Sequence, residues 1–287
     1  MKTKEKILIL GGKGMLGSDL CFVFRNDETV CWGRKDLDIT KKKEVERKIK
    51  KLNPKIVINA AAYTDVEMAE KEFFLAKKIN SQGVKNLVNV CAEIGAIFVH
   101  YSTDYVFDGK KKSGYRESDL PKNPTNKYGL SKLFGEKVIE NYRLKNKNFK
   151  YYLIRTSWLF GSKTEPKKHK NFVQTILKLA RKKKVLRVVN DQFGKPTYTL
   201  DLAKATRRII KEKLPFGIYH LTNEGITTWY KFAKEIVKLA KIKIKVLPCS
   251  SSEYKTLAKR PKYSILINTK LPKLRSWKLA LKEYLKL

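Results

Sequence analysis

The chain has 287 residues, of which 42% are hydrophobic, so it is long enough to bury a large core in one big domain or two unequal ones. It carries 64 Lys and Arg against 27 Asp and Glu, a net charge of +37, which suits either a polyanionic partner or a lysine-rich, solvated surface. Because the lysines are spread along the chain and accompany no recognised nucleic-acid-binding motif, we do not expect nucleic acid to be the main partner. No apolar run approaches twenty residues, and the run at 7–10 is too short for a secretion signal, so we expect no membrane span.

The four cysteines are widely separated and form no Cys-x-x-Cys motif. We therefore expect reduced thiols in a cytoplasmic protein, and no zinc site. The residues are Cys21, Cys31, Cys91 and Cys249.

The chain begins with a pattern typical of dinucleotide-binding folds. The apolar run Lys6–Leu10 predicts a buried parallel strand. Gly11, Gly14 and Gly17 follow at once, before an apolar-periodic helix around 20–24. Glycines in this position let the backbone approach a pyrophosphate, which the helix N-terminus favours electrostatically. The alternative is a mere tight turn.

The next two predicted strands, near 29–32 and 55–59, end in residues that suggest cofactor contacts. After the first, Arg34 stands where NAD-binding folds often place an acid, and a cation there suits the 2′-phosphate of NADP. Asp38 lies close by, so NADPH is our expectation and NADH the alternative. After the second strand, the small residues 60–62 would let a cofactor lie against the backbone.

The remaining elements continue the alternation of strands and helices. Strands are predicted at 96–101 and 151–156, and a helix that starts at Pro124 and Thr125 runs to about Tyr142. Such alternation implies an α/β fold, a Rossmann-like doubly wound parallel sheet. A strand at 217–221 is expected to rejoin that sheet. We predict a dinucleotide-binding domain of 1–157 and 195–223, and a smaller α/β substrate domain of 158–194 and 224–287.

Tyr128 and Lys132 are the central candidate pair. Four residues apart on a helix, they lie on one face, and a nearby positive charge lowers the pKa of a tyrosine from its usual value of about 10. Such a pair can exchange a proton with a hydroxyl or carbonyl oxygen, which a hydroxyl of Ser102 or Thr103 could hold. This arrangement suits hydride transfer, provided that the chain also binds a nicotinamide cofactor.

A second Tyr-x-x-x-Lys occurs at Tyr230 and Lys234. Apolar residues at helical spacing surround it, so we interpret Lys234 as a surface lysine on an amphipathic helix. The three histidines, His100, His169 and His220, are expected to be structural, because none accompanies a nucleophile or a metal partner in the pattern.

Several blocks together carry a family resemblance. The sequence resembles the dTDP-4-dehydrorhamnose reductases of the extended short-chain dehydrogenase/reductase family over nearly its whole length. The blocks are Asn59–Thr64, His100–Phe107, Pro124–Lys132 with Gly135-Glu136, Arg155–Trp158, Asn190–Thr197 and Arg260-Pro261.

The resemblance implies a role for each matching residue. Tyr128 would donate the proton, Lys132 would hold the nicotinamide ribose and lower the pKa of Tyr128, and Thr103 would hydrogen-bond the sugar carbonyl. Asp104 and Trp158 would contact the nucleotide-sugar. Contacts with the cofactor would come from Gly14, Met15 and Leu16 at the diphosphate, Asp38 and Ile39 at the adenine, and Ala62, Tyr63 and Thr64 at the ribose and nicotinamide.

The implied activity is NADPH-dependent reduction of a dTDP-4-keto-6-deoxy sugar, giving dTDP-L-rhamnose. A nucleotide-sugar epimerase is one alternative. A dehydratase is disfavoured because Tyr105, not a glutamate, follows Asp104. A relative of the family serves as the non-catalytic regulatory subunit of methionine adenosyltransferase, which is the alternative from another class. Some members are magnesium-assisted dimers, but no carboxylate cluster here suggests a metal site, so Mg²⁺ and a homodimer stay open.

Overall fold

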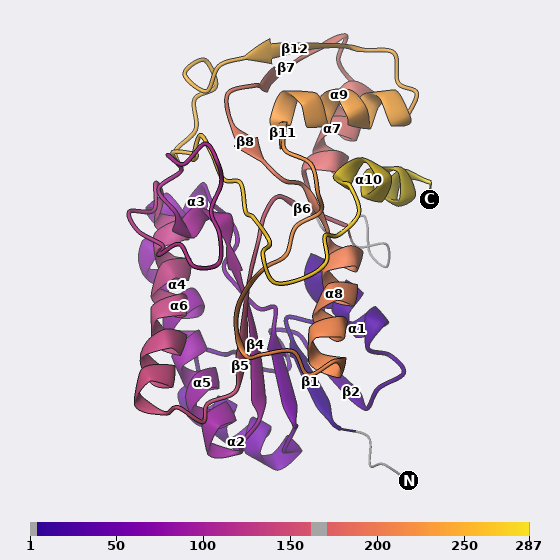
Figure 1. The fold of residues 1–287 in the computed structure, drawn as a ribbon. Helices are drawn as coiled ribbons and strands as arrows, with labels where there is room; N and C mark the ends of the chain where they lie inside the picture. The colour runs from indigo at the N-terminus through magenta and orange to yellow at the C-terminus, as the bar shows by residue number, and fades with distance from the viewer. Residues whose placement is uncertain (1–4, 162–170, 287) are drawn as a thin grey trace.

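The computed structural model describes residues 5–161 and 171–286. Its centre is a six-stranded sheet in the order β10-β5-β4-β3-β1-β2, in which every neighbouring pair is parallel. The chain runs from β1 to the edge strand β2 and then returns to the other side of β1, where β3 lies (Figure 1). The strands are β1 (Ile7–Leu10), β2 (Thr29–Trp32), β3 (Ile56–Asn59), β4 (Ile97–Thr103), β5 (Tyr151–Thr156) and β10 (Gly217–His220). The doubly wound parallel sheet is confirmed, and so is the return of the late strand to it.

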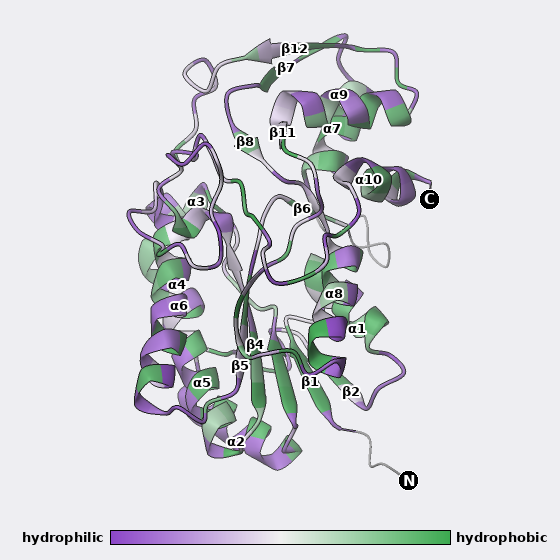
Figure 2. Cartoon of the chain, in the orientation of Figure 1, coloured by the Kyte–Doolittle hydropathy of each residue, from purple (hydrophilic) through white to green (hydrophobic). Residues whose placement is uncertain are grey.

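Both faces of the sheet are buried, which explains the continuous apolar runs of its strands (Figure 2). Successive side chains point to opposite faces. Ile7 and Ile9 belong to the core beneath α1 (Met15–Val23) and α8 (Thr199–Lys211). Leu8 and Leu10 belong to the core on the opposite face. The helices there are α2 (Lys42–Leu52), α5 (Gly83–Glu93) and α6 (Lys127–Lys145).

The segment between β3 and α5 begins with irregular backbone and becomes helical from Met68. It comprises α3 (Met68–Lys71), α4 (Phe73–Lys77) and the π-helical turn η1 (Lys78–Gln82). The wide turn passes close to α6, where a side chain on Gly135 would place its Cβ 2.2 Å from the carbonyl oxygen of Asn80. No pattern in the sequence predicts the widened turn.

A smaller part of the chain lies beyond the carboxyl ends of the main strands (Figure 1). Its own core joins aromatic and aliphatic residues such as Phe160, Phe232 and Trp277. Its helices are α7 (Phe172–Ala180), α9 (Trp229–Leu239) and α10 (Trp277–Leu285), and its strand pairs are β6 (Leu159–Phe160) with β9 (Thr197–Tyr198), β7 (Val185–Val189) with β12 (Lys245–Cys249), and β8 (Phe193–Gly194) with β11 (Thr227–Thr228). The division into domains at the predicted residues stays a prediction.

The predicted start of the helix that carries Tyr128 is wrong by a few residues. The N-cap of α6 is Asn126, whose Oδ1 accepts a hydrogen bond of 2.8 Å from the backbone N–H of Gly129. Pro124 and Thr125 precede the helix.

The expectation of reduced thiols is wrong for one pair of cysteines. Cys21 on α1 and Cys31 on β2 form a disulfide, with their Cα atoms 6.3 Å apart. The turn that follows β1 lays α1 beside β2, which brings positions ten apart in sequence within bridging distance. Cys91 and Cys249 are free and buried. The cytoplasmic location therefore stays an expectation without the support of uniformly reduced thiols.

Among the described residues, no helix is both long and apolar enough to cross a membrane. His169, which we expect to be structural, lies outside the described residues.

Candidate active site

A cavity of about 540 Å³ lies where β3, β4 and β5 end. The carboxyl edge of a parallel sheet is where α/β folds bind ligands. The cavity brings together nine of the predicted site residues: Met15, Leu16, Ala62, Thr64, Thr103, Asp104, Tyr128, Lys132 and Trp158. It also contains residues to which the sequence assigned no role, among them Tyr105, Thr156, Ser157, Trp229 and Arg260.

Tyr128 is placed by the tightly packed first turn of α6. The next residue, Gly129, packs against the turn that follows β4, so that an added Cβ would sit 2.1 Å from the carbonyl oxygen of Tyr105. The ring of Tyr105 meets that of Tyr128 edge to face, with centroids 6.1 Å apart. This contact fixes the phenol against the cavity wall.

Lys132 lies one turn further along the same face of α6 and is 2% exposed. Its Nζ donates a hydrogen bond of 2.6 Å to the carbonyl oxygen of Tyr101 and lies 3.4 Å from Nε2 of His100. Burial lowers the pKa of Lys132 to about 8, while the carboxylate of Glu136 acts in the opposite direction. The amine can therefore change its charge near neutral pH.

The expected lowering of the Tyr128 pKa is not what the structure shows. Burial raises the pKa of the phenol, the neighbouring carboxyl of Asp104 raises it further, and the hydroxyl of Thr103 acts in the opposite sense. The Nζ of Lys132 is directed at the backbone carbonyl of Tyr101, and burial disfavours its charge. A raised pKa keeps the phenol protonated, which is the state that a proton donor needs.

Thr103 and Asp104 follow one another at the end of β4. The hydroxyl of Thr103 donates a hydrogen bond of 2.9 Å to Oδ1 of Asp104, and both side chains are buried. Burial raises the pKa of Asp104 to about 7, although hydrogen bonds from Ser264 and Thr103 work against the shift. Asp104 is therefore an acid that can hold a proton near neutral pH.

The Gly-rich turn leads into Met15 and Leu16, which line the cavity, whereas Gly11 and Gly14 themselves do not. Gly11 adopts φ 73°, and a Cβ on Gly17 would lie 1.9 Å from the carbonyl oxygen of Gly11, so neither position tolerates a side chain. Gly14 is the N-cap of α1 and offers no side-chain cap, which leaves the first N–H groups of the helix for a ligand.

Two buried hydroxyls test whether a nicotinamide cofactor fits here. Ser102 Oγ and Thr156 Oγ1 are buried without a hydrogen-bond partner among the described residues. Both residues line the cavity, together with Met15 and Tyr128. Buried polar groups of this kind ordinarily have partners, so a ligand with polar groups fits the site.

The remaining predicted cofactor residues lie outside the cavity. Arg34 is exposed, and its charge helps to lower the pKa of Asp38, whose carboxylate accepts hydrogen bonds from Thr40. The side chain of Ile39 packs into the core against Gly83, and its backbone carbonyl accepts a 2.9 Å hydrogen bond from Nδ2 of Asn86. Tyr63 directs its hydroxyl to Glu72, at 2.8 Å.

Trp158, the predicted substrate contact, is half of an aromatic stack. Its ring lies parallel to that of Trp229 with centroids 3.6 Å apart. Trp158 has φ 48° and its indole contacts Gly194 so closely that a Cβ there would come within 2.4 Å. The residue is half-buried and both indoles line the cavity. Trp229 became recognisable only in three dimensions, because in sequence it is the first residue of an ordinary amphipathic helix.

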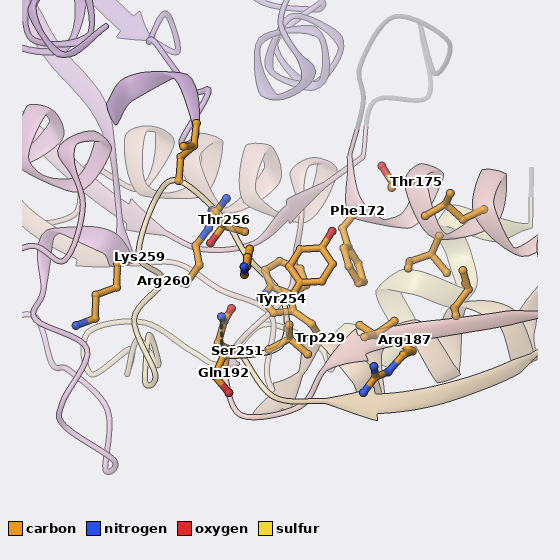
Figure 3. A pocket seen from close by; sticks show the side chains of 18 of the residues that line it. Phe172, Thr175, Arg187, Gln192, Trp229, Ser251, Tyr254, Thr256, Lys259 and Arg260 are labelled. Atoms are coloured by element: carbon orange, nitrogen blue, oxygen red, sulfur yellow. Dashed lines mark hydrogen bonds between the residues drawn. The ribbon is translucent and has the colours of Figure 1, made fainter. Parts of the chain in front are cut away.

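Figure 3 shows a larger cavity, of about 870 Å³. Tyr105, Trp229 and Arg260 line both this cavity and the first. Its walls combine aromatic rings with cationic side chains. They include Phe172, Arg187, Tyr254, Lys255 and Lys259. Together the two cavities form a site long enough to extend from Tyr128 into the smaller part of the chain.

Arg260 stands at the junction of the two cavities. Its guanidinium pairs with Glu67, and Nη1 donates to the hydroxyl of Tyr105 at 3.4 Å. Glu67 also accepts a 2.7 Å hydrogen bond from the backbone N–H of Leu257. Because Glu67 follows β3 and Leu257 belongs to the smaller part, this contact fixes one wall of the site against the other.

The second Tyr-x-x-x-Lys copy is separate from the cavity-lining pair. Lys234 is exposed and its Nζ lies 5.6 Å from the centre of the Tyr230 ring, as expected for a surface lysine on α9. No group of three or more His, Cys, Asp or Glu side chains suited to a metal occurs among the described residues.

The fold and the site together define a class, a dinucleotide-binding oxidoreductase with a tyrosine–lysine pair. The chain belongs to the RmlD substrate binding domain family, whose model matches residues 5–287.

The similar proteins agree with this assignment. The spore coat polysaccharide biosynthesis protein SpsK of Bacillus subtilis is 40% identical over 98% of this chain and 96% of its own length. A crystal structure of a dTDP-4-dehydrorhamnose reductase from Clostridium acetobutylicum is 41% identical, with a TM-score of 0.91 over 98% of both chains. A dTDP-4-dehydrorhamnose reductase from Bacillus anthracis, in complex with NADP, is 36% identical with a TM-score of 0.91 over 99% of both chains.

Proposed function

We propose that this chain reduces the 4-keto group of dTDP-4-dehydrorhamnose with NADPH, giving dTDP-L-rhamnose. The observation that carries the proposal is the convergence of Thr103, Tyr128 and Lys132 on one cavity at the carboxyl edge of the sheet. Two proteins of known structure that are similar to this chain over nearly its full length are named as this reductase. The same set favours a catalyst over the regulatory role considered above.

NADPH would supply a hydride to C4 of the sugar. Tyr128 would give the proton of its hydroxyl to the sugar O4, so that one hydride and one proton convert the ketone to an alcohol. Thr103 would hold the same oxygen before the transfer. Its hydroxyl now donates to Asp104, and it would turn that donor to the substrate carbonyl.

Residues around the Gly-rich turn would hold the cofactor. The N-terminus of α1 suits the diphosphate, and the unpaired hydroxyls of Ser102 and Thr156 suit the ribose and nicotinamide. Arg34 would contact the 2′-phosphate of NADPH, because a guanidinium can make paired hydrogen bonds to a phosphate. The Bacillus anthracis relative is in complex with NADP, which supports a nicotinamide cofactor for this chain.

The two cavities would divide the nucleotide-sugar between them. Trp158 and Asp104 would contact the sugar next to Tyr128. The larger cavity, with its aromatic rings and cations, suits a base and a diphosphate (Figure 3). Mg²⁺ and a homodimer stay open expectations.

The experiment is to mix the protein with NADPH and either dTDP-4-dehydrorhamnose or the corresponding UDP-sugar, and to follow NADPH absorbance. The proposal expects oxidation of NADPH that depends on the dTDP-sugar, with dTDP-rhamnose as the product. Stereochemical conversion of the sugar without net NADPH oxidation would instead indicate an epimerase.

A further inference from the structure

His100 lies on β4, buried beside Lys132, and the mechanism above gives it no role. The side chain is 1% exposed and its ring stacks on Phe98, with centroids 5.9 Å apart. Its Nδ1 lies 3.1 Å from Nδ2 of Asn59, and its Nε2 lies 3.4 Å from Nζ of Lys132. The ring therefore bridges a residue at the end of β3 and the lysine of the active site.

The hydrogen bonds fix which nitrogen of His100 carries the proton. The backbone N–H of Ala61 donates to Asn59 at 3.1 Å, so the atom that it meets must be the amide oxygen, Oδ1. The NH₂ group of Asn59 then faces His100. An NH₂ group can only donate, so Nδ1 must accept, and in a neutral imidazole the proton is on Nε2.

An N–H on Nε2 is directed at Lys132. A neutral amine can accept from this N–H, whereas an ammonium would set two donors against each other. The opposite tautomer would accommodate an ammonium, but it would oppose the NH₂ of Asn59, whose orientation the N–H of Ala61 holds. The chain is thus arranged so that the charge of Lys132 and the orientation of Asn59 are coupled.

We infer that His100, held by Asn59 as the Nε2–H tautomer, is a positioning residue that favours the neutral amine form of Lys132. The inference deepens the proposed reductase function and rests on it for its consequence, which is that Lys132 changes charge within the working pH range. The low pKa of Lys132 agrees in direction, and burial holds the pKa of His100 well below its usual value, so the ring stays neutral.

Other groups that face Lys132 act differently. Glu136, on the same helix, favours the ammonium, but Arg155 of β5 holds its carboxylate in a buried ion pair. Tyr101 of β4 presents only its backbone carbonyl to Nζ. Tyr128 and Asp104 share the cavity with Lys132. Among these groups, His100 presents the N–H that opposes a positive charge.

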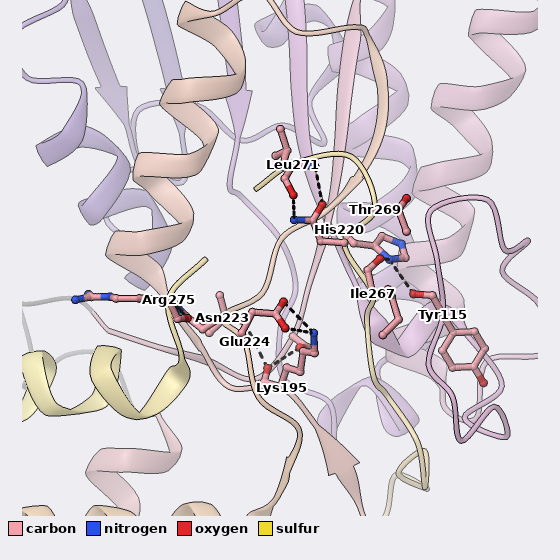
Figure 4. A network of polar contacts seen from close by, with 12 residues as sticks. Tyr115, Lys195, His220, Asn223, Glu224, Ile267, Thr269, Leu271 and Arg275 are labelled. Atoms are coloured by element: carbon pink, nitrogen blue, oxygen red, sulfur yellow. Dashed lines mark hydrogen bonds and ion pairs between the residues drawn. The ribbon is translucent and has the colours of Figure 1, made fainter. Parts of the chain in front are cut away.

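The first test is the tautomer itself, read from long-range ¹H–¹⁵N spectra of protein labelled in its three histidines. His100 is expected as Nε2–H. His220 is the matched control. Its Nδ1 lies 3.1 Å from the carbonyl oxygen of Tyr115 (Figure 4). Because a carbonyl oxygen can only accept, Nδ1 of His220 must carry the proton. An Nδ1–H tautomer or an imidazolium at His100 near neutral pH would overturn the inference, whether or not the protein proves to be a reductase.

The second test is Asn59→Asp. A carboxylate accepts from both Ala61 and His100, so the proton moves to Nδ1 and Nε2 becomes an acceptor for the Lys132 ammonium. We expect the tautomer of His100 to switch. The pKa of Lys132, read as the basic limb of the kcat–pH profile, should rise by about one pH unit or more.

His100→Gln provides an independent variant if Asn59→Asp does not fold. Its amide can turn the oxygen to Lys132, so the basic limb should again move up. A folded variant of either kind with the wild-type profile would show that His100 only fills space.

Discussion

The buried ion pair between Glu136 and Arg155 ties the helix of Tyr128 and Lys132 to the central sheet. The two side chains are 1% and 0% exposed, and the guanidinium donates hydrogen bonds of 3.0 and 2.8 Å to the carboxylate. Glu136→Gln would leave the charge of Arg155 buried without its partner. Breaking a buried pair in this way costs about 3–5 kcal/mol of unfolding free energy.

The size of the chain converts this cost into a melting temperature. At about 2.1 cal/mol/K per residue, the unfolding entropy of the chain is about 0.6 kcal/mol/K, so Glu136→Gln should lower Tm by about 5–8 °C. The matched control is Glu212→Gln, which breaks an exposed pair with Arg208 on α8 and should cost less than about 1 kcal/mol. Calorimetry of the three proteins measures both effects.

The same variant should also act on the active site. Glu136 raises the pKa of Lys132, so its removal should lower that pKa below about 8 and move the basic limb of activity to lower pH. If Glu136→Gln melts within about 2 °C of the wild type, the ion pair does not anchor the helix and the reasoning fails.

Three further outcomes follow from other parts of the structure. Arg34→Ala should reduce the preference for NADPH over NADH, measured as the ratio of kcat/KM values; an unchanged ratio would remove Arg34 as the selector. Trp158→Phe should raise KM for the keto-sugar while NADPH affinity and Tm stay nearly unchanged, whereas a lower Tm with an intact KM would make it a packing residue. Burial lowers the pKa of His220 to about 3, so the unfolded chain binds the extra proton between pH 6.5 and 3. Stability should therefore fall with decreasing pH in that window by about 1.4 kcal/mol per unit, and urea titrations of His220→Gln should lack this slope.

Local patterns in the sequence predict most of the fold. The apolar runs of β1, β3 and β5 are continuous because both faces of a parallel sheet are buried, and this signal needs no knowledge of distant residues. The widened turn η1 carries no such signal. The spacing of the cysteines does not predict the disulfide, because it does not show that α1 lies beside β2.

Within the site, sequence patterns predict the residues that follow strands or share a helix face, such as Thr103, Tyr128 and Lys132. Sequence patterns assign no role in the site to Trp229 or Arg260, because tertiary contacts, not local spacing, bring them to the cavity. The electrostatics also required the structure. The raised pKa of Tyr128 depends on its burial beside Asp104, which the Tyr-x-x-x-Lys pattern does not reveal.

The central claim is that Tyr128 is the proton donor of a reductase. The most direct measurement compares turnover of NADPH and dTDP-4-dehydrorhamnose by the wild type, Tyr128→Phe and Tyr230→Phe, because Tyr230 belongs to the copy of the motif that does not line the cavity. Tyr128→Phe should lower kcat by about 10²–10⁴ with cofactor affinity little changed, and Tyr230→Phe should retain wild-type turnover. Full activity in Tyr128→Phe, or its loss in Tyr230→Phe alone, would contradict the account.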